Sequence, residues 1–382
     1  MRRGRKTPIY VPVSDSTSLT DRCPWVVGRW AERDAPEPQG SQWKRGGLPA
    51  WKGDRMVTGQ RGPHRQRPED AVIRVSVTDR CNLRCRYCMP AAGISKLRRE
   101  DLLPLERLAD TVAWLSREFE VSRVKLTGGE PLLRDGVVGL VQTLAAIPGV
   151  SEVSATTNGA RLVELAPSLR GAGLSRVNVS VDSLDKRRFA ELTRGGRLAD
   201  TLAGIGAALD CGLTPVKMNA VLLSSNWRSD VPLLLDFAGR QGLEIRFIEL
   251  MRTGTEVAWA EREYVSADEV RGWLGSRTEV VDDRSASPGP ARSSMIRWRG
   301  VAVRVGWITP RSRPFCDSCS RLRLDARGRV RRCLMDPVRF DLAELLETTV
   351  EPEVRSRLHA YLAGKAASSA MESDLPMVSM GG

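Results

Sequence analysis

Histidine is scarce in this chain of 382 residues, with only His64 and His359 present. A Ser-His-Asp triad, a His-rich zinc site or a histidine general base would have to use one of these two residues. Both lie near the ends of the chain, in segments that lack the pattern of a folded core. The eight Cys residues are therefore the main supply of soft metal ligands.

Long hydrophobic runs are also missing, since no stretch approaches the roughly 18 apolar residues that a membrane-spanning helix needs. The basic start, Met1–Lys6, is not followed by the apolar segment of a signal peptide. We therefore expect a cytoplasmic protein without a membrane partner. In that compartment, clustered Cys residues more often bind metal or do chemistry than form disulfides.

The bulk composition is that of a globular protein, with 41% hydrophobic and 27% charged residues. The length allows two or three domains, or one barrel with an appendage. The formal net charge is +13, and residues 1–70 hold 14 Lys and Arg against 8 Asp and Glu. A basic balance suits nucleic acid, an anionic membrane surface or a phosphorylated small molecule, and charge alone does not choose among them.

Residues 1–70 contain 8 Pro, 8 Gly and four Trp, with no sustained hydrophobic period. Such a segment buries too little apolar surface to offset the entropy lost on ordering. We expect a mostly disordered extension. Two alternatives remain open: translation begins at Met56, or the segment is a basic, aromatic arm that binds nucleic acid.

From Ile73 onward, short β-branched runs alternate with amphipathic segments. The candidate strands are Ile73–Val77, Val121–Thr127, Val150–Thr156, Ser175–Val181, Thr214–Val221 and Leu243–Leu250. The candidate helices are Leu105–Glu118, Gly136–Ala146, Leu162–Gly171, Leu198–Cys211 and Val231–Gln241. This alternation predicts an α/β fold with a parallel sheet or open barrel over residues 71–251, with its chemistry at the carboxyl ends of the strands.

The alternation ends near Arg252. One candidate helix, Ser266–Gly275, leads into short candidate strands. These are Glu279–Asp282, Ser294–Trp298, Val301–Val305, Leu322–Asp325 and Val330–Cys333. We predict a smaller C-terminal α+β domain over residues 252–345, followed by helical turns and a tail over residues 346–382.

Three Cys residues, Cys81, Cys85 and Cys88, follow the first candidate strand within eight residues. A structural zinc site needs four ligands, and no nearby His or Cys completes this set. Three thiolates on a cubane iron–sulfur cluster instead leave one iron open for a substrate or cofactor. We therefore predict an iron–sulfur site.

The spacing of these Cys residues resembles the signature of the radical S-adenosylmethionine superfamily. Thr127–Pro131, read Thr-Gly-Gly-Glu-Pro, is similar to that superfamily's motif for the methionine amino group. The resemblance implies a [4Fe-4S] cluster that cleaves S-adenosylmethionine to a 5′-deoxyadenosyl radical, and an incomplete (β/α)6 barrel. The positions that match the S-adenosylmethionine site are Tyr87, Gly129, Ser180 and Met251.

A second set, Cys316, Cys319 and Cys333, again has three members. A zinc ribbon would need a further Cys-x-x-Cys pair, and none follows Cys333. A second open-site cluster is therefore predicted. Cys23 and Cys211 stand alone, and we expect a free buried thiol at Cys211.

Two such sets make the chain similar to the family of GTP 3′,8-cyclases, lyases of molybdenum cofactor biosynthesis, over residues 72–335 and the last few residues. The segment Phe315–Leu334 and the terminal Gly381-Gly382 follow the family pattern. The resemblance implies two [4Fe-4S] clusters, S-adenosylmethionine, and GTP as substrate, with the guanine held at the second cluster. The implied catalytic residues are Arg321, Arg323, Gly381 and Gly382.

A triphosphate carries about four negative charges, so its pocket needs several cations. The matching substrate positions are Arg74, Arg123, Lys125, Thr156, Lys217, Arg246, Arg321 and Arg323. Arg123 and Lys125 are exchanged in type relative to some relatives, which keeps the charge and alters the geometry of the donors. Their separate roles therefore stay open.

The resemblance also implies partners: cyclic pyranopterin monophosphate synthase as the downstream enzyme, a reducing electron donor and a second copy in a homodimer, with no nucleic acid. Two alternatives remain at this point. One is another radical enzyme with an auxiliary cluster that modifies a peptide or tRNA. The other is a Cys-based zinc module that binds nucleic acid, which iron and sulfide analysis would distinguish.

Overall fold

The computed structural model describes residues 71–253, 256–282, 291–316, 319–336, 339–363, 372–373 and 376–377. They belong to a compact unit that runs from Gln60 to Gly382. The expectations for residues 1–70, and those for Gly381 and Gly382, lie outside the described residues.

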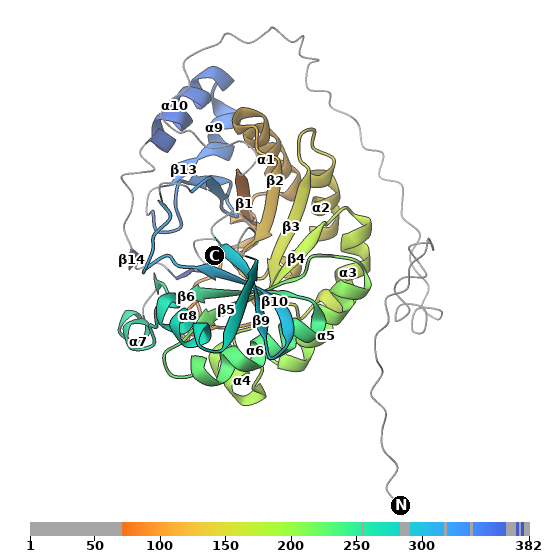
Figure 1. Cartoon of the computed structure of the whole chain (residues 1–382). Coiled ribbons are helices and arrows are strands. Elements are labelled where there is room, and N and C mark those ends of the chain that lie inside the picture. The colour runs from red at the N-terminus through yellow and green to blue at the C-terminus, as the bar shows by residue number, and fades with distance from the viewer. Residues whose placement is uncertain are drawn as a thin grey trace, which may run out of the picture. The chain divides into compact units, whose positions relative to one another are not determined.

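Six parallel strands, joined in chain order, form the centre of the sheet (Figure 1). They are β1 (Val72–Ser76), β2 (Arg123–Thr127), β3 (Glu152–Thr157), β4 (Arg176–Ser180), β5 (Lys217–Leu222) and β6 (Glu244–Glu249). Each begins within three residues of its prediction, because the β-branched runs are buried in a single apolar core. The α/β fold class is confirmed.

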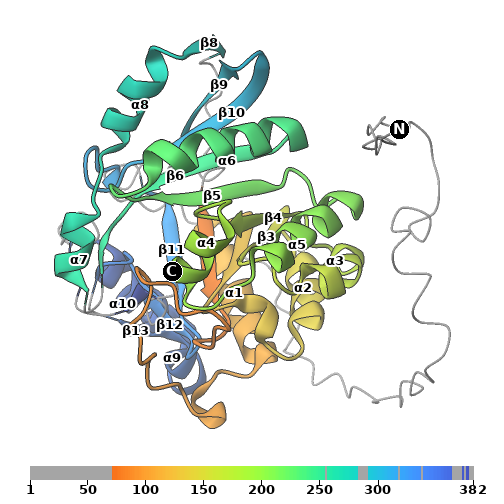
Figure 2. The ribbon, with the colours of Figure 1, turned by 90° about the horizontal axis from the view of Figure 1, so that it is seen from below.

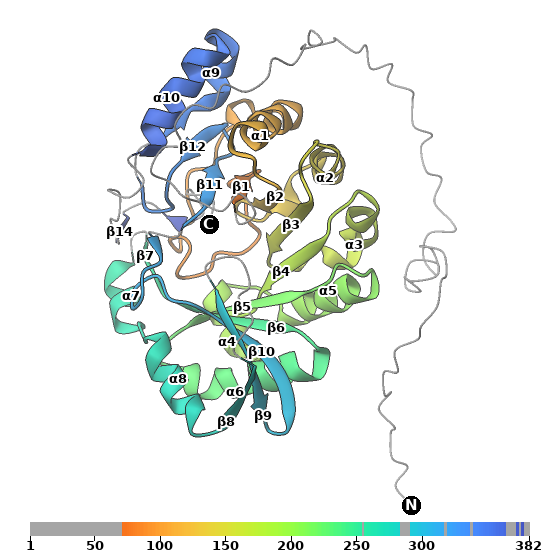
Figure 3. The same cartoon turned by 45° about the horizontal axis from the view of Figure 1, so that its top comes forward.

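Helices connect these strands on the outer side of the sheet, where α2, α3 and α5 lie together (Figures 2 and 3). The connecting helices are α1 (Leu105–Phe119), α2 (Val137–Ala145), α3 (Leu162–Gly171), α4 (Lys186–Thr193), α5 (Leu198–Asp210) and α6 (Trp227–Gln241). The sequence reading missed α4, since it begins Lys-Arg-Arg and buries little more than Phe189 and Leu192. Asp185 caps it by accepting a hydrogen bond from the backbone N–H of Arg188.

The C-terminal part adds strands to both sides of the central six. Strand β10 (Val301–Ile308) pairs in parallel with β6, and β11 (Arg321–Leu324) pairs in parallel with β1. The predicted boundary at residue 251 is therefore crossed by two strand pairs. The remaining elements are β7 (Arg252–Thr253), α7 (Val257–Arg262), α8 (Ala267–Gly275), β8 (Thr278–Asp282), β9 (Arg292–Trp298), β12 (Arg329–Arg331), β13 (Phe340–Asp341), α9 (Leu342–Thr348), α10 (Glu351–Ala363), β14 (Glu372–Ser373) and the 3-10 turns η2 (Arg99–Asp101) and η3 (Pro131–Leu133).

The two faces of the sheet differ in character. Ile73 and Val75 on β1 are fully buried in the apolar core beneath the helices. Arg74 lies between them and therefore faces the opposite side, which is the concave interior. Lys125 on β2 and Arg246 on β6 are separated by three strands of the sheet, yet their charges interact, because the sheet curves into an open barrel.

Among the described residues, no helix has the length and apolar character needed to cross a membrane.

Candidate active site

The loop that carries Cys81, Cys85 and Cys88 follows β1 and is attached to the end of α4. The backbone N–H of Arg84 donates to the carbonyl of Thr193 at 3.0 Å, and that of Arg86 donates to Leu192 at 2.9 Å. The Cys88 N–H closes a turn on the Cys85 carbonyl at 2.8 Å. The carbonyls left unpaired at a helix end thus fix the Cys loop.

The three thiols lie within electrostatic reach of one another. Burial raises the pKa of Cys85 well above its usual value, and the neighbouring Cys88, Asp182 and Cys81 raise it further. Burial likewise raises the pKa of Cys81 to about 11. Among the described residues, no three His, Cys, Asp or Glu side chains converge on a single metal ion. Three neighbouring thiols suit a cluster in which each thiolate binds a different iron.

Gly128 and Gly129, at the end of β2, pack directly on the Cys loop. A Cβ on Gly129 would lie 2.3 Å from the carbonyl oxygen of Arg80, and one on Gly128 would lie 2.6 Å from that of Thr78. The Gly129 N–H donates to the Thr78 carbonyl at 2.7 Å. The glycines are therefore required for the close approach of two backbones, in addition to any contact with a ligand.

Glu130 of the same turn is 2% exposed and joins the ends of β2 and β3. Its carboxylate accepts hydrogen bonds from the Thr157 hydroxyl at 2.7 Å, the Asn158 N–H at 2.7 Å and the Leu132 N–H at 3.1 Å. The Asn158 side chain in turn donates to Asn82 in the Cys loop at 2.8 Å. This network positions the predicted cluster loop against two strand ends.

Three of the residues predicted for S-adenosylmethionine occupy the carboxyl ends of different strands, and the fourth, Tyr87, lies in the Cys loop. Gly129 follows β2, Ser180 ends β4 and Met251 follows β6. The hydroxyl of Tyr87 donates to Asp182 at 2.7 Å. The carboxyl ends of the strands form one edge of the barrel, and parallel α/β folds place their functional side chains at that edge.

Asp182 is a site residue that the sequence reading did not assign. It is buried, it also accepts a hydrogen bond from the Val221 N–H at 2.9 Å, and burial raises its pKa to about 6. The sequence could have indicated Asp182 as a candidate, since it stands two residues after Ser180 at the end of a predicted strand.

Several predicted substrate cations lie side by side in the barrel interior. Arg74 on β1 is the register partner of Lys125 on β2 and of Arg323 on β11. Burial and, to a smaller extent, the charge of Arg321 lower the pKa of Arg74 to about 10. Burial lowers the pKa of Lys125 well below its usual value, with Arg176 and Arg74 adding to the shift. Buried neighbouring cations of this kind favour an anionic ligand.

Two carboxylates on the same face pair with cations. Glu152 on β3 binds Arg176 on β4 through two contacts of 2.7 and 3.2 Å. Glu244 on β6 lies 2.9 Å from the Nζ of Lys217 and 2.6 Å from the Nε of Arg246. The sequence reading assigned none of Glu152, Arg176 and Glu244, although their alternation within the strands places them inside.

Arg123 and Thr156 complete the predicted substrate set in the interior. Arg123 is the register partner of Val72 on β1 and of Glu152 on β3. Thr156 is the register partner of Asn178 on β4. Both are half-buried.

The second Cys set lies around β11 and β12. The Cys319 N–H donates to the Cys316 carbonyl at 3.1 Å, and Cys316 is exposed. Arg321 donates from Nε to the Sγ of Cys319 at 3.3 Å. Burial, together with the charges of Arg74 and Arg321, holds the pKa of Arg323 well below its usual value. Cys333 and Cys319 act in the opposite direction and raise it. The second set thus adjoins the cationic interior.

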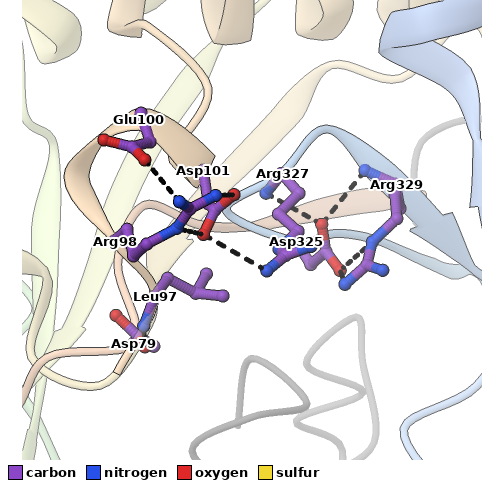
Figure 4. Close-up of polar contacts among 8 residues, drawn as sticks. All are labelled: Asp79, Leu97, Arg98, Glu100, Asp101, Asp325, Arg327 and Arg329. Carbon is purple, nitrogen blue, oxygen red and sulfur yellow. Dashed lines mark hydrogen bonds and ion pairs between the residues drawn. The ribbon is translucent and has the colours of Figure 1, made fainter. Parts of the chain in front are cut away.

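The two Cys-bearing regions are also linked through the turn between β11 and β12 (Figure 4). The Leu103 N–H donates to the Ala326 carbonyl at 2.8 Å, and Arg327 lies 3.8 Å from Asp101. Within the first loop, Asp79 accepts a hydrogen bond from the Leu97 N–H at 2.6 Å. The segment between β1 and α1 is therefore fixed near its start through Asp79 and near its end through Asp101 and Leu103.

Comparison with known proteins shows the family of the chain. Residues 75–238 match the Radical SAM superfamily model, and residues 243–371 match the model named Molybdenum Cofactor Synthesis C. A GTP 3′,8-cyclase of Moorella thermoacetica is 48% identical over 69% of this chain and 80% of that protein. GTP 3′,8-cyclase 1 of Pseudomonas aeruginosa is 44% identical over 72% of this chain and 82% of that protein.

The chain belongs to the GTP 3′,8-cyclase family.

Membership of the radical SAM superfamily brings with it an iron–sulfur cluster and S-adenosylmethionine. The crystal structure of SuiB from Streptococcus suis bound to S-adenosylmethionine superposes with a TM-score of 0.54 at 14% identity, over 77% of this chain and 68% of that chain. At this identity the likeness shows the fold alone. The assignment of this chain to one family within the superfamily therefore rests on its sequence relatives.

Proposed function

We propose that the chain is a radical SAM lyase that converts GTP to (8S)-3′,8-cyclo-7,8-dihydroguanosine 5′-triphosphate, the first step of molybdenum cofactor biosynthesis. The observation that carries this proposal is the charge of the barrel interior between the two Cys sets. The strands β1 to β6 and β11 carry seven predicted substrate cations and Arg176 at interior positions, none of them on β3. On these strands the carboxylates are Glu152, Glu244 and Glu249.

Glu249 does not reduce this positive charge, because it faces the other side of β6. It is 1% exposed and accepts hydrogen bonds from the backbone N–H groups of Ala267 and Ser312 at 2.9 Å each. The interior therefore has a large excess of positive charge in partly desolvated surroundings. A triphosphate of about four negative charges relieves the repulsion among these cations.

The clusters would be held by Cys81, Cys85 and Cys88 and by Cys316, Cys319 and Cys333. When bound, the first cluster and S-adenosylmethionine supply the radical that takes the hydrogen atom from C3′ of the ribose. Tyr87 of the Cys loop and the strand-end residues Gly129, Ser180 and Met251 would bind the cofactor. The chain itself supplies orientation and the exclusion of water.

Arg321 and Arg323 act at the guanine end of the substrate in this proposal. The Arg321 guanidinium contacts Cys319 and stacks over Phe315 with its Cζ 5.0 Å from the ring centre, and Arg323 interacts electrostatically with Cys319. A guanidinium can donate two parallel hydrogen bonds to guanine O6 and N7. Arg74, Arg123, Lys125, Lys217 and Arg246 then hold the phosphates, and Thr156 contacts the nucleotide. Gly381 and Gly382 stay assigned to the active site by family resemblance.

The proposal extends to partners and location. Cyclic pyranopterin monophosphate synthase consumes the product, a reducing donor supplies electrons to the clusters, and the enzyme acts as a homodimer in the cytoplasm. Peptide or tRNA modification by a radical enzyme with an auxiliary cluster is the competing function. The C-terminal family match to Molybdenum Cofactor Synthesis C weighs against it.

Anaerobic turnover with GTP and S-adenosylmethionine tests the function. The reconstituted enzyme should bind about eight iron atoms per chain, as two cubane clusters require. It should form 5′-deoxyadenosine and the cyclised nucleotide together. Formation of 5′-deoxyadenosine at the same rate with and without GTP, with no cyclised product, would instead favour the competing function.

A further inference from the structure

Glu244 lies between two of the cations assigned to the triphosphate. It is 6% exposed, its Oε2 is 2.9 Å from the Nζ of Lys217, and its Oε1 accepts a hydrogen bond of 2.6 Å from the Nε of Arg246. The Lys217 and Arg246 side chains are each 11% exposed. One buried carboxylate therefore contacts two cations on neighbouring strands.

Strand register accounts for this contact. Lys217 and Glu244 are partners in the parallel pair β5–β6, so their side chains leave the same face of the sheet. Arg246 follows Glu244 by two residues and points to the same face. The three charged groups are thus held by two paired strands of the central sheet.

The ion pairs use only one part of each cation. Glu244 binds the Nε edge of Arg246, and a guanidinium has a second edge, formed by its two terminal nitrogens, that can bind a phosphate. The ammonium of Lys217 has three donors, one of which is directed at Glu244. Both cations are therefore fixed in place while they keep donors that can be used for an anion.

We propose that Glu244 is a positioning residue for the nucleotide, which orders Lys217 and Arg246 before the triphosphate binds. The inference rests on the proposed function, because it takes GTP as the ligand. Without the carboxylate the two cations would repel each other, and both flexible side chains would lose rotamer freedom only when the phosphate arrived. Ordering the cations in advance therefore strengthens binding of the phosphates.

The charge state of Lys217 supports this role. Burial lowers its pKa, and Arg246 on β6 and Arg176 on β4 lower it further, whereas Glu244 on β6 raises it. The protonated form binds phosphate, so affinity is present below the pKa of Lys217 and lost as the pH rises through it. Loss of Glu244 lowers that pKa, so affinity for GTP declines at a lower pH.

The test is equilibrium binding of GTP and of GMP to the reconstituted enzyme under anaerobic conditions, for the parental chain and Glu244→Gln. We expect the variant to bind GTP about tenfold or more weakly, since a charged hydrogen-bonded group is lost, while GMP binding changes less. The variant's GTP affinity should decline at lower pH than the parental affinity. In turnover, KM for GTP should rise with little change in kcat.

Asp236→Asn is the matched control. Asp236 lies on α6 and accepts hydrogen bonds of 2.8 Å from both the Trp298 Nε1–H and Arg299, outside the barrel interior. This control removes the same charge and should bind GTP as the parental chain does. Circular dichroism and iron content report whether each variant folds.

The outcomes separate the two proposals. GTP affinity unchanged or increased in Glu244→Gln overturns the positioning role. If that variant does not fold, Glu244→Asp carries the test, because it keeps the charge on a shorter side chain. Weaker GTP binding by Glu244→Asp with GMP binding retained supports the role, and unchanged GTP binding contradicts it. Failure of the parental enzyme to bind GTP would refute the proposed function itself.

Discussion

Arg321 donates a hydrogen bond from its Nε to the Sγ of Cys319 at 3.3 Å. The contact joins the second Cys set to the cationic barrel interior, because Arg321 is two residues from Arg323 on the same face of β11. A residue that contacts both a proposed cluster ligand and the substrate pocket is well placed to orient the substrate relative to the second cluster.

Arg321→Lys keeps the charge and removes the planar set of donors. We expect formation of cyclised nucleotide to fall by about 100-fold, since a misplacement of about 1 Å has an effect of that size. Cleavage of S-adenosylmethionine, scored as 5′-deoxyadenosine, should stay within a few-fold of the parental rate. Product formation at the parental rate would show that Arg321 has no part in orientation. Iron content serves as the control for loss of the second cluster.

The two Cys sets should be separable by substitution. Replacing Cys81, Cys85 and Cys88 by Ala should remove about four iron atoms per chain and abolish cleavage of S-adenosylmethionine, because the open iron is lost. The same change at Cys316, Cys319 and Cys333 should also remove about four iron atoms, yet leave some cleavage without cyclised product. Iron analysis and chromatography of 5′-deoxyadenosine check both results. Zinc in place of iron in the parental protein would contradict the assignment.

Arg194, which directly follows α4, contacts the Cys loop through its side chain. It donates to the carbonyls of Met89 at 2.8 Å and Arg84 at 3.3 Å, and it pairs with Glu256 at 2.5 Å. Hydrogen bonds from a charged group contribute about 1.5–3 kcal/mol each, so Arg194→Ala should favour local opening of the loop.

The measurement is the rate at which a chelator removes iron from the reconstituted protein, which we expect to rise about tenfold or more. Arg187→Ala is the matched control on α4, since its contact with Glu191 at 3.6 Å is exposed to solvent. Equal iron-loss rates in the two variants would mean that Arg194 does not hold the loop.

Gly129→Ala and Gly139→Ala form a second matched pair. The added Cβ at Gly129 meets the Arg80 carbonyl, so we expect a loss of about 1–3 kcal/mol in unfolding free energy together with faster iron loss. At Gly139, inside α2, a Cβ meets nothing within 4 Å. Alanine there should stabilise the protein by about 0.5–1 kcal/mol through helix propensity. Denaturant unfolding checks both signs, and a neutral Gly129→Ala would refute the packing argument.

Sequence patterns predicted the central strands and most helices because each is a local property. β-Branched runs such as that of β1 and the amphipathic period of α1 are visible within a few residues. Helix α4 was missed, since its start is polar and its burial depends on distant partners. The places of β10 and β11 beside β6 and β1 could not be read either, because strand pairing over long separations leaves no local signal.

The candidate site likewise has features that the sequence predicted and contacts that it did not predict. By itself the sequence determined the two Cys sets, the glycine-rich turn and the basic strand residues, because ligand spacing and residue type are written in short segments. The tertiary structure decided which charges meet. Curvature of the sheet brings Lys125 near Arg246, and strand register sets Glu244 between Lys217 and Arg246. Electrostatic interactions depend on distance in space, and only the folded sheet fixes those distances.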